Sequence, residues 1–321
     1  MKGRGRRRIA PAATPDPLLL LSEANAGNTM TTSFTVGDVT IHRIIESEAP
    51  IFDPLTFFPD LTQAQLDENR GWMEQTNALD AATGKVNLCI QSYLVKTPHH
   101  TILIDSCVGN DKDRPARPFW HRMTSDRWMR NLAAAGVGID DIDFVMCTHL
   151  HVDHVGWNTV LRDGRWVPTF PKARYVFAKG EYDHWVGENA KSPIAPMIDS
   201  VLPIVEAGRA DLVANDFALD DLVRLESTPG HTPDHVAVRL GRRDASAVVT
   251  GDLIHSPLQA RYPEVSMFAD FDRKQSAVTR RRFLEGCCES GTLMCTAHFP
   301  SPSVGRLARW GEGFRLNSAT P

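Results

Sequence analysis

The stretch Thr148-His149-Leu150-His151-Val152-Asp153-His154 places three histidines and one aspartate within six residues. It directly follows Phe144-Val145-Met146-Cys147, a short apolar run with the length and composition of a buried β-strand. A strand that ends in His-x-His-x-Asp-His delivers four imidazole and carboxylate groups into one loop. Such groups are ligands for Zn²⁺ and neighbouring first-row metals. A purely structural role would crowd titratable groups together without partners, so the pattern predicts a metal site.

The composition of the chain is that of an ordinary globular protein of 321 residues with a formal net charge of −4. This slight negative charge gives no sign of a nucleic-acid-binding surface. No apolar run approaches the roughly 18 residues needed to cross a bilayer. The six cysteines form no C-x-x-C pair, which favours reduced thiols in a cytoplasmic protein. We therefore expect a cytoplasmic protein that has neither nucleic-acid nor membrane partners.

The first 29 residues are predicted to form a disordered N-terminal extension, followed by one folded domain over residues 30–321. Residues 1–8 are strongly basic, but the apolar run at 18–21 is shorter than the roughly 7–15 residues of a signal-peptide core. Met30 is a natural alternative start of the chain. A cleaved leader stays open as an alternative interpretation.

Polar residues also follow other segments that have the pattern of strands. His231 lies in a tight turn after one of them, where Pro and Gly fix the backbone. Asp252 follows a predicted buried strand at 245–250, and His298 follows another at 292–296. One strand-end histidine can arise by chance, but this series predicts a shared metal site. The candidate ligands are His149, His151, Asp153, His154, His231, Asp252 and His298.

Two further residues near this series are predicted to support it. Asp105 ends a predicted strand at 101–104, and a carboxylate there can orient a ligand histidine through its distal N–H. The alternative is an aspartate that simply starts a turn. His235, at the start of a strand, is expected to support or pack against the site rather than to bind metal.

The remaining segments predict an alternation of strands and helices. Residues 46–84 are expected to be irregular apart from a helix at 62–72 capped by Thr62. The aromatic residues there are candidates for a pocket wall or, alternatively, anchors that hold a long loop to the core. The helix at 274–288 carries a basic face at 280–282 that we expect to be solvated. Other predicted strands lie at 34–45 (a pair), 88–96, 173–178, 217–219, 222–227 and 304–314 (a hairpin), and other helices at 125–135, 179–186 and 193–205.

The candidate ligands resemble the motif set of the metallo-β-lactamase superfamily. Residues 149–154 meet the hallmark His-x-His-x-Asp-His, and His231, Asp252 and His298 meet the later single ligands. The similarity covers roughly residues 34–310. It implies an α/β protein with a four-layer αβ/βα sandwich, so that residues 30–321 form one metallo-β-lactamase-fold hydrolase domain.

The resemblance also implies two metal ions, expected to be Zn²⁺ with Mn²⁺, Co²⁺ or Fe²⁺ as substitutes. Seven protein ligands are too many for one tetrahedral zinc, but they suit two ions about 3.5–4 Å apart. Asp252 is implied to bridge the ions, and a hydroxide between them would attack the substrate. His149, His151 and His231 are implied to hold the first ion, and Asp153, His154 and His298 the second.

The function that the resemblance implies is a dinuclear zinc-dependent hydrolase. Its metal-bridging hydroxide would cleave a neutral ester, lactone or organophosphate triester, which are small molecules. A glyoxalase II-like thioesterase is the alternative, although no clear glutathione-binding basic tail is present. Iron redox or nuclease activity is disfavoured because relatives with those activities carry an additional domain.

Residues 251–255 and 297–300 indicate which branch of the superfamily the chain resembles most. These look most similar to the methyl-parathion-hydrolase-like branch, with quorum-quenching lactonases next. Acyl-homoserine lactonases commonly carry a tyrosine three residues after the bridging aspartate, where this chain has His255. Asp153 and His255 are therefore the predicted catalytic residues, and Phe119, Trp120 and His255 the predicted substrate contacts. A homodimer is expected by analogy with lactonases.

Overall fold

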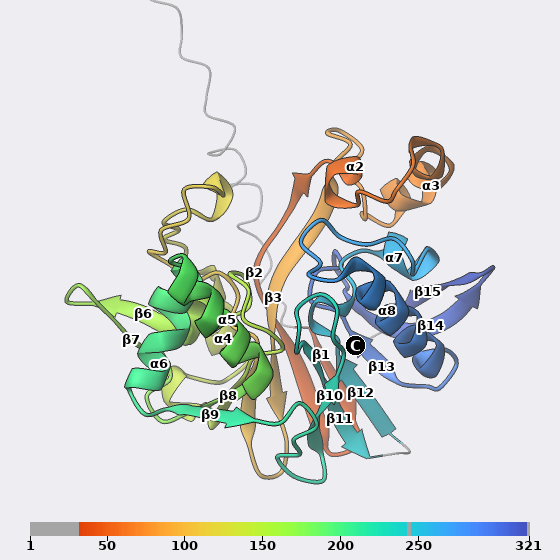
Figure 1. Ribbon diagram of the computed structural model, residues 1–321. Helices are drawn as coiled ribbons and strands as arrows, with labels where there is room; N and C mark the ends of the chain where they lie inside the picture. Colours follow the sequence, from red (N-terminus) through yellow and green to blue (C-terminus); the bar gives the residue numbers. More distant parts are fainter. Residues whose placement is uncertain (1–31, 243–244, 320–321) are drawn as a thin grey trace, which may run out of the picture. The chain divides into compact units, whose positions relative to one another are not determined.

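The computed structural model describes residues 32–242 and 245–319, which form two large β-sheets with helices on their outer faces (Figure 1). The predicted extension at residues 1–29 lies outside the described residues. Each sheet shows the alternation of inward and outward side chains that the sequence pattern requires. A small separate hairpin pairs β6 (Thr159–Arg162) with β7 (Arg165–Pro168).

The first sheet has seven strands in the order β1-β2-β3-β4-β5-β8-β9. Its β4 pairs in parallel with β5, and β5 pairs in parallel with β8, so these strands end at the same edge. The strands are β1 (Ser33–Val36), β2 (Val39–Phe52), β3 (Val86–Lys96), β4 (Thr101–Ile104), β5 (Phe144–Met146), β8 (Arg174–Ala178) and β9 (Ala210–Val213).

The second sheet has six strands in sequential order, β10 to β15. Its single parallel pair joins β12 to β13, which again end side by side. The strands are β10 (Val223–Ser227), β11 (Val236–Arg242), β12 (Ala245–Val249), β13 (Leu293–Cys295), β14 (Val304–Trp310) and β15 (Gly313–Ser318).

The main core lies between the two sheets. Ile104 and Met146 from the first sheet pack there with Val238, Val249 and Cys295 from the second. Alternate residues on the same strands face outward and pack against helices. Helix α4 (Arg127–Ala134), α5 (Lys179–Lys191) and α6 (Leu202–Glu206) cover the first sheet, and α7 (Pro257–Arg261) and α8 (Arg273–Cys287) cover the second (Figure 1). The predicted four-layer αβ/βα sandwich is therefore confirmed.

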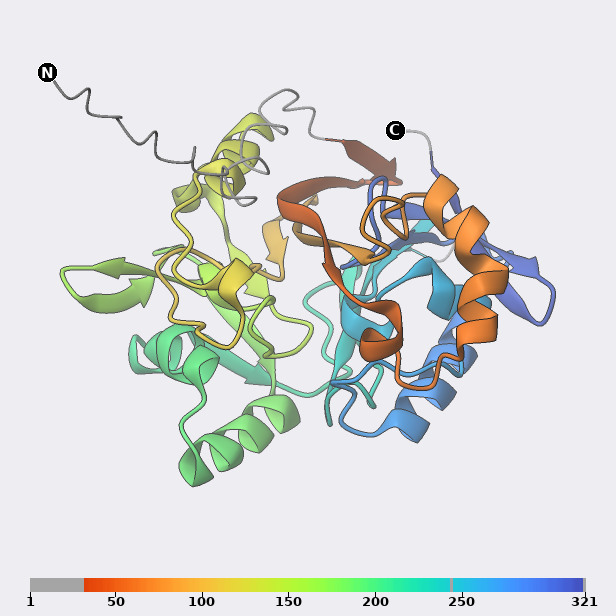
Figure 2. The same ribbon diagram turned by 90° about the horizontal axis from the view of Figure 1, so that it is seen from above.

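Two helices extend the layer over the second sheet. Helices α2 (Pro54–Phe57) and α3 (Gln63–Gln75) lie beside α7 in both views (Figures 1 and 2). Phe57 and Leu66 pack there with Leu258 of α7. The predicted N-cap of α3 is confirmed, because the Thr62 hydroxyl accepts a hydrogen bond from the Gln65 N–H at 3.2 Å in a capping box.

Several predictions of local structure are wrong in detail. β2 continues to Phe52 through the segment predicted to be irregular, because it pairs with β3 as far as Val86. Residues 217–219 form no strand and contribute only an isolated bridge, while β9 was not predicted. The predicted solvated basic face of α8 is wrong at Arg280, which is fully buried.

No helix among the described residues is long and apolar enough to span a membrane.

Candidate metal centre

The candidate ligands meet because two parallel strand pairs end next to each other. Residue Ile104 of β4 is in register with Met146 of β5, so Asp105 lies beside the loop that carries the His-x-His-x-Asp-His motif. In the second sheet Val249 of β12 is in register with Cys295 of β13, which brings the following Asp252 and His298 together. The loop after β10 adds His231.

The first group of ligand atoms comprises His149, His151, His231 and Asp252, whose ligand atoms all lie within 4.8 Å of one another. The Nδ1 atom of His151 lies 3.0 Å from Nε2 of His231. Asp252 Oδ2 lies 3.2 Å from His231 Nε2 and 3.7 Å from His149 Nε2. Three imidazole nitrogens thus converge on one carboxylate oxygen.

The second group comprises Asp153, His154 and His298. The ring nitrogens of the two histidines in this group approach the other oxygen of Asp252. Asp252 Oδ1 lies 2.8 Å from His298 Nε2 and 3.0 Å from His154 Nε2. Asp153 Oδ2 lies 3.7 Å from His298 Nε2. The two carboxylate oxygens of Asp252 therefore face two different histidine clusters, and all seven candidate ligands come together.

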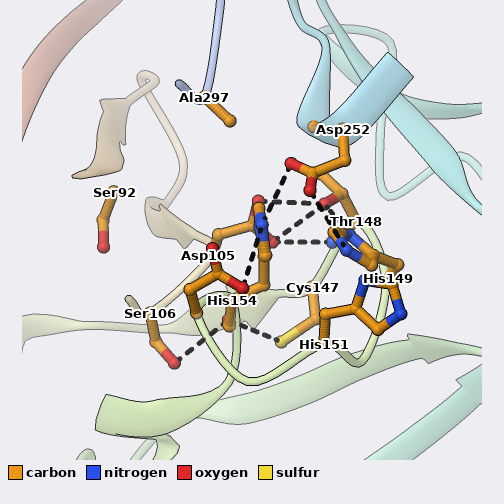
Figure 3. Close-up of polar contacts among 12 residues, drawn as sticks. Ser92, Asp105, Ser106, Cys147, Thr148, His149, His151, His154, Asp252 and Ala297 are labelled. Carbon is orange, nitrogen blue, oxygen red and sulfur yellow. Dashed lines mark hydrogen bonds and ion pairs between the residues drawn. The ribbon is translucent and has the colours of Figure 1, made fainter. Parts of the chain in front are cut away.

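Three of the histidines are oriented by acceptors on their far side. His154 Nδ1 lies 2.8 Å from Asp105 Oδ2, which confirms the predicted supporting role of Asp105 (Figure 3). Asp105 also accepts hydrogen bonds from the Thr148 N–H and hydroxyl. His298 Nδ1 lies 2.9 Å from the carbonyl oxygen of Cys89. These contacts leave the Nε2 atoms of His154 and His298 directed at the shared site.

The acceptor behind His231 is Asp270, which the sequence analysis missed. Asp270 Oδ1 lies 2.8 Å from His231 Nδ1. Its Oδ2 accepts the Met267 N–H at 3.0 Å and lies 3.4 Å from Nη2 of Arg280. Asp270 follows no predicted strand and belongs to no motif, so no local signal in the sequence could have identified it.

His235 and Gly251 bring the turn that carries Asp252 close to the motif loop. The Asp252 N–H donates a hydrogen bond to His235 Nε2 at 3.0 Å, and burial lowers the pKa of His235 to about 3. Gly251 has a φ of +51°, and a Cβ atom there would lie 2.6 Å from both His235 Nε2 and Thr148 Oγ1. Glycine is therefore required for this approach. The prediction that His235 supports the site is confirmed by the hydrogen bond.

The candidate ligand histidines fall into two kinds. Although burial alone would lower them, the charge of Asp252 raises the pKa values of His154, His231 and His298, so a divalent cation would displace their protons. Burial lowers the pKa values of His149 and His151 well below the usual value, which favours neutral imidazoles with free lone pairs. Despite its burial, Asp252 has a pKa well below its usual range because His154 and His298 surround it. Neutral imidazoles and ionised carboxylates are the forms that bind divalent metals.

A metal ion is the group that these residues fit. His149 Nε2 is buried and has no hydrogen-bond partner among the described residues. An orphaned imidazole nitrogen of this kind is costly unless a ligand satisfies it. The donor set of imidazoles and carboxylates is that of zinc and neighbouring first-row metals. The two groups can each hold one divalent cation, with Asp252 shared between them.

A cavity of about 470 Å³ opens over the ligands. Its wall is mostly apolar, and segments far apart in sequence, from Phe52 to His298, contribute to it. Two of the three predicted substrate contacts, Trp120 and His255, line the cavity. Phe119 is not among the lining residues and packs edge-on against Phe52, with ring centroids 5.8 Å apart. Residues that sequence reasoning missed on this wall include Arg114, Trp185, Ile194, Met267 and Phe268.

His255 lies between the cavity and Asp252. Its Nε2 is 3.1 Å from Asp252 Oδ2, and its Nδ1 is buried without a hydrogen-bond partner among the described residues. Burial lowers the pKa of His255, although the charge of Asp252 opposes this. A neutral His255 can donate its Nε2–H to the carboxylate, so the ring is placed to orient Asp252.

Comparison with known protein families gives one match that spans more than half of the chain. The family is described as the Metallo-beta-lactamase superfamily, and residues 90–285 match it. The chain is 24% identical over 225 residues to an N-acyl homoserine lactonase from Bacillus cereus, covering 66% of this chain and 82% of the relative. The family and this relative confirm the prediction of an enzyme of the metal-dependent hydrolase class.

Solved structures share the fold over a larger part of the chain. One is AidC, a dizinc quorum-quenching lactonase in complex with a product, with a TM-score of 0.75 at 20% identity, covering 90% of this chain and 97% of AidC. Another is the hydrolase AbOPH of the beta lactamase superfamily, with a TM-score of 0.75 at 24% identity and the same coverage. At these sequence identities, the structural similarity is evidence for the shared fold alone.

Proposed function

Because this chain belongs to the metallo-β-lactamase superfamily, we propose that it is a dinuclear zinc hydrolase of a small lactone or ester. The proposed ligands are His149, His151 and His231 for one ion and Asp153, His154 and His298 for the other, with Asp252 shared. A neutral organophosphate triester is a further proposed substrate, since its reaction also develops charge on an oxygen that metals stabilise.

The observation that carries this proposal is the placement of Asp252. Each of its two carboxylate oxygens lies within 3.2 Å of a ring nitrogen from a different histidine cluster. One carboxylate shared in this way is suited to two ions rather than one. Both clusters open on the same cavity, so a substrate in the cavity meets both.

The chemistry of the reacting bond follows from this arrangement. When bound, two divalent cations supply a water of lowered pKa and polarise the oxygen of the scissile bond. The chain itself orients the ligand histidines through Asp105, Asp270 and the Cys89 carbonyl. His255 is proposed to hold Asp252 in place and to contact the substrate, and Asp153 to accept a proton near the cavity floor.

The cavity wall supports a substrate with an apolar portion. Phe52, Phe57, Trp120, Trp185 and Ile194 line it. Burial of apolar substrate surface against these side chains contributes roughly 25 cal/mol per Å². The relatives in the comparison are named lactonases, which supports a lactone with an apolar substituent as the first proposed substrate.

The test is a hydrolysis panel run on the purified protein with its metal content measured alongside. The panel contains lactones, aryl esters, a phosphotriester, a thioester and a β-lactam, before and after chelation and zinc addition. We expect zinc-dependent lactone or ester turnover, close to two ions per chain, and loss of both in Asp252→Ala and His231→Ala. The control Asp211→Ala alters a surface ion pair with Arg174 and should change neither.

The outcomes separate the alternatives. Preferred thioester turnover would favour the glyoxalase II-like function instead. Full activity in Asp252→Ala, or one ion per chain in active wild type, would contradict the dinuclear proposal. The predicted homodimer is also retained as a proposal, which sedimentation of the full chain would test.

A further inference from the structure

The cavity that contains the candidate metal ligands is also lined by a buried arginine, whose positive charge is opposite to that of the ligand carboxylates. Arg114 is only 4% exposed, yet it lines the same cavity as Asp153, Asp252 and His298. It belongs to the long loop between β4 and α4, which the sequence analysis did not connect with charge recognition. A buried guanidinium keeps its charge, so each of its N–H groups needs an acceptor.

Part of the guanidinium is held by a buried carboxylate. Arg114 Nη1 and Nη2 donate to the two oxygens of Asp199 at 2.6 and 2.9 Å, which is a bidentate end-on pair. Nη1 also donates to the carbonyl oxygen of Asp113 at 3.0 Å. On the other side of Asp199, Lys112 Nζ donates to the Asp199 carbonyl at 3.1 Å and to Thr159 Oγ1 at 2.6 Å. These contacts fix the plane of the guanidinium.

Two donors of Arg114 are left over on one edge. The five N–H groups of arginine form a rigid planar fork, and three are used by Asp199 and Asp113. The remaining two are Nε–H and the second hydrogen of Nη2, which point in the same direction. Nε is buried and has no hydrogen-bond partner among residues 32–242 and 245–319. This edge has the geometry that binds a carboxylate or carbonyl oxygen side-on.

We propose that Arg114 is a specificity-determining residue that binds a carbonyl or carboxylate oxygen on the substrate, away from the scissile bond. This inference rests on the proposed function, because it assumes that the reacting bond lies at the metal ligands. The substrate would then carry two polar ends, one at the metal centre and one at the side-on edge of Arg114. Trp120 and Ile194, which line the same cavity, would pack against its apolar part.

The fixed position of the donors supports substrate recognition. Asp199 and Lys112 hold Arg114 before a ligand arrives, so little side-chain freedom is lost on binding. Asp199 balances the charge of Arg114, since burial lowers the pKa of the neighbouring Lys112 to about 7, and Arg117 adds a positive charge to the cavity wall. The wall therefore carries positive charge, and the unpartnered Nε–H of Arg114 lies buried behind it, so an acceptor oxygen would reach this donor when a neighbouring side chain of the cavity shifts.

The experiment compares matched substrates in wild type and Arg114→Lys. Three γ-butyrolactones would carry an α-substituent of equal length: an alkyl chain, an amide-linked chain and a chain with a terminal carboxylate. Lysine keeps a cation beside Asp199 but loses the planar fork. The matched control is Arg280→Lys, which alters a second buried arginine that is not among the cavity-lining residues.

For Arg114→Lys we expect kcat/KM to fall roughly 10- to 100-fold on an acceptor-bearing lactone, the range for losing a hydrogen bond to a charged group. The alkyl lactone should change by less than about threefold. A selective loss on the amide would identify a neutral carbonyl as the ligand, and a selective loss on the carboxylate would identify an anion. The Arg280→Lys control should affect all three lactones equally.

An equal loss on all three lactones, or no loss on any, would overturn the role of Arg114. Circular dichroism shows whether Arg114→Lys folds. If it does not, the double variant Arg114→Met with Asp199→Asn is compared with wild type instead, because it removes both charges of the buried pair together. Binding of the corresponding lactams by calorimetry gives a second readout without turnover. Wild type that hydrolyses neither these lactones nor the esters and the phosphotriester of the panel would contradict the proposed function. Lactone turnover without an effect of Arg114→Lys would contradict this inference alone.

Discussion

Two buried arginines, Arg280 behind the metal centre and Arg114 on the cavity wall, differ in how completely their donors are used. Arg280 donates through Nε to Leu253 O at 2.8 Å and through Nη1 to the carbonyls of Pro263 and Val265. Its Nη2 donates to Ser276 Oγ at 2.8 Å and lies 3.4 Å from Asp270. All five of its donor positions are satisfied within the chain.

Arg114 has a bidentate carboxylate but leaves its side-on edge without a partner among the described residues. Burying a charged group that is only partly satisfied lowers stability, and a fold that retains one has usually gained something by it. Arg280 thus has every donor used within the chain, whereas Arg114 keeps an unpartnered donor, which we have proposed to serve a ligand. Arg280 is connected to the candidate metal ligands only through Asp270, which in turn contacts His231.

The largest effect on stability is expected from Arg280→Met. This change leaves Asp270 buried beside His231 without its cation, and breaking a buried pair in this way costs about 3–5 kcal/mol. Denaturant unfolding with matched metal content would measure the loss. Arg114→Met should cost less, because Lys112 Nζ remains 3.8 Å from Asp199. A larger loss in Arg114→Met than in Arg280→Met would contradict the comparison.

The next effect is a pH dependence of stability from Glu46, which anchors the start of the loop that carries Arg114. Burial raises the pKa of Glu46 to about 7, against hydrogen bonds from the Val108 and Gly109 N–H groups and from Trp157 that lower it. A raised pKa means that the folded state binds the proton more tightly. The stabilisation is therefore complete below about pH 4.5 and is lost as pH rises through 7.

Glu46→Gln removes this titration, so the variant should gain stability relative to wild type between pH 5 and 8. The pKa shift corresponds to at most about 3 kcal/mol. Thermal unfolding at several pH values, with wild type as reference, would measure the difference. Parallel stability curves for the two proteins would show that Glu46 does not titrate in this range.

A smaller effect is expected from Asp270→Asn, which keeps the shape of the carboxylate but weakens the acceptor behind His231. Loss of such an orienting group lowers metal affinity roughly 10- to 100-fold. Competition with a chromophoric chelator would measure it, with Asp105→Asn as the equivalent change behind His154. The surface variant Asp211→Asn serves as the control. Unchanged affinity in both buried variants would show that the histidines are oriented by other contacts.

The smallest effect is expected for an exposed ion pair, which provides the baseline for the two buried arginines. Lys179 pairs with Asp183 one turn along α5, and both side chains are more than half exposed. Such pairs contribute about 0.3–0.5 kcal/mol. Lys179→Ala should therefore shift the unfolding midpoint very little in denaturant. A loss of stability in Lys179→Ala as large as that in Arg280→Met would show that exposed and buried ion pairs do not differ in their contribution.

Sequence patterns predicted most of the strands and the candidate ligands because both are local, whereas the two-sheet sandwich was expected from the resemblance to the metallo-β-lactamase superfamily. Alternation along a strand and a motif within one turn depend on residues that are neighbours in sequence. Even His298, which lies beyond the family match at residues 90–285, was identified from its place after a strand. The errors came where tertiary contacts decide. Arg280 has the appearance of a solvated residue on a basic helix face, yet loops from residues 253 to 270 enclose it.

The sequence by itself determined that several strands end in candidate metal-ligand residues, and its resemblance to the metallo-β-lactamase superfamily implied the αβ/βα architecture. The tertiary structure showed that the two oxygens of Asp252 face different histidine clusters, as the resemblance had implied. Only the tertiary structure decided that Asp270 lies behind His231. Only the tertiary structure, too, pairs Arg114 with Asp199, 85 residues away, and leaves one edge of its guanidinium toward no partner. The physical reason is that hydrogen-bond satisfaction depends on groups brought together by packing, and no local periodicity encodes that.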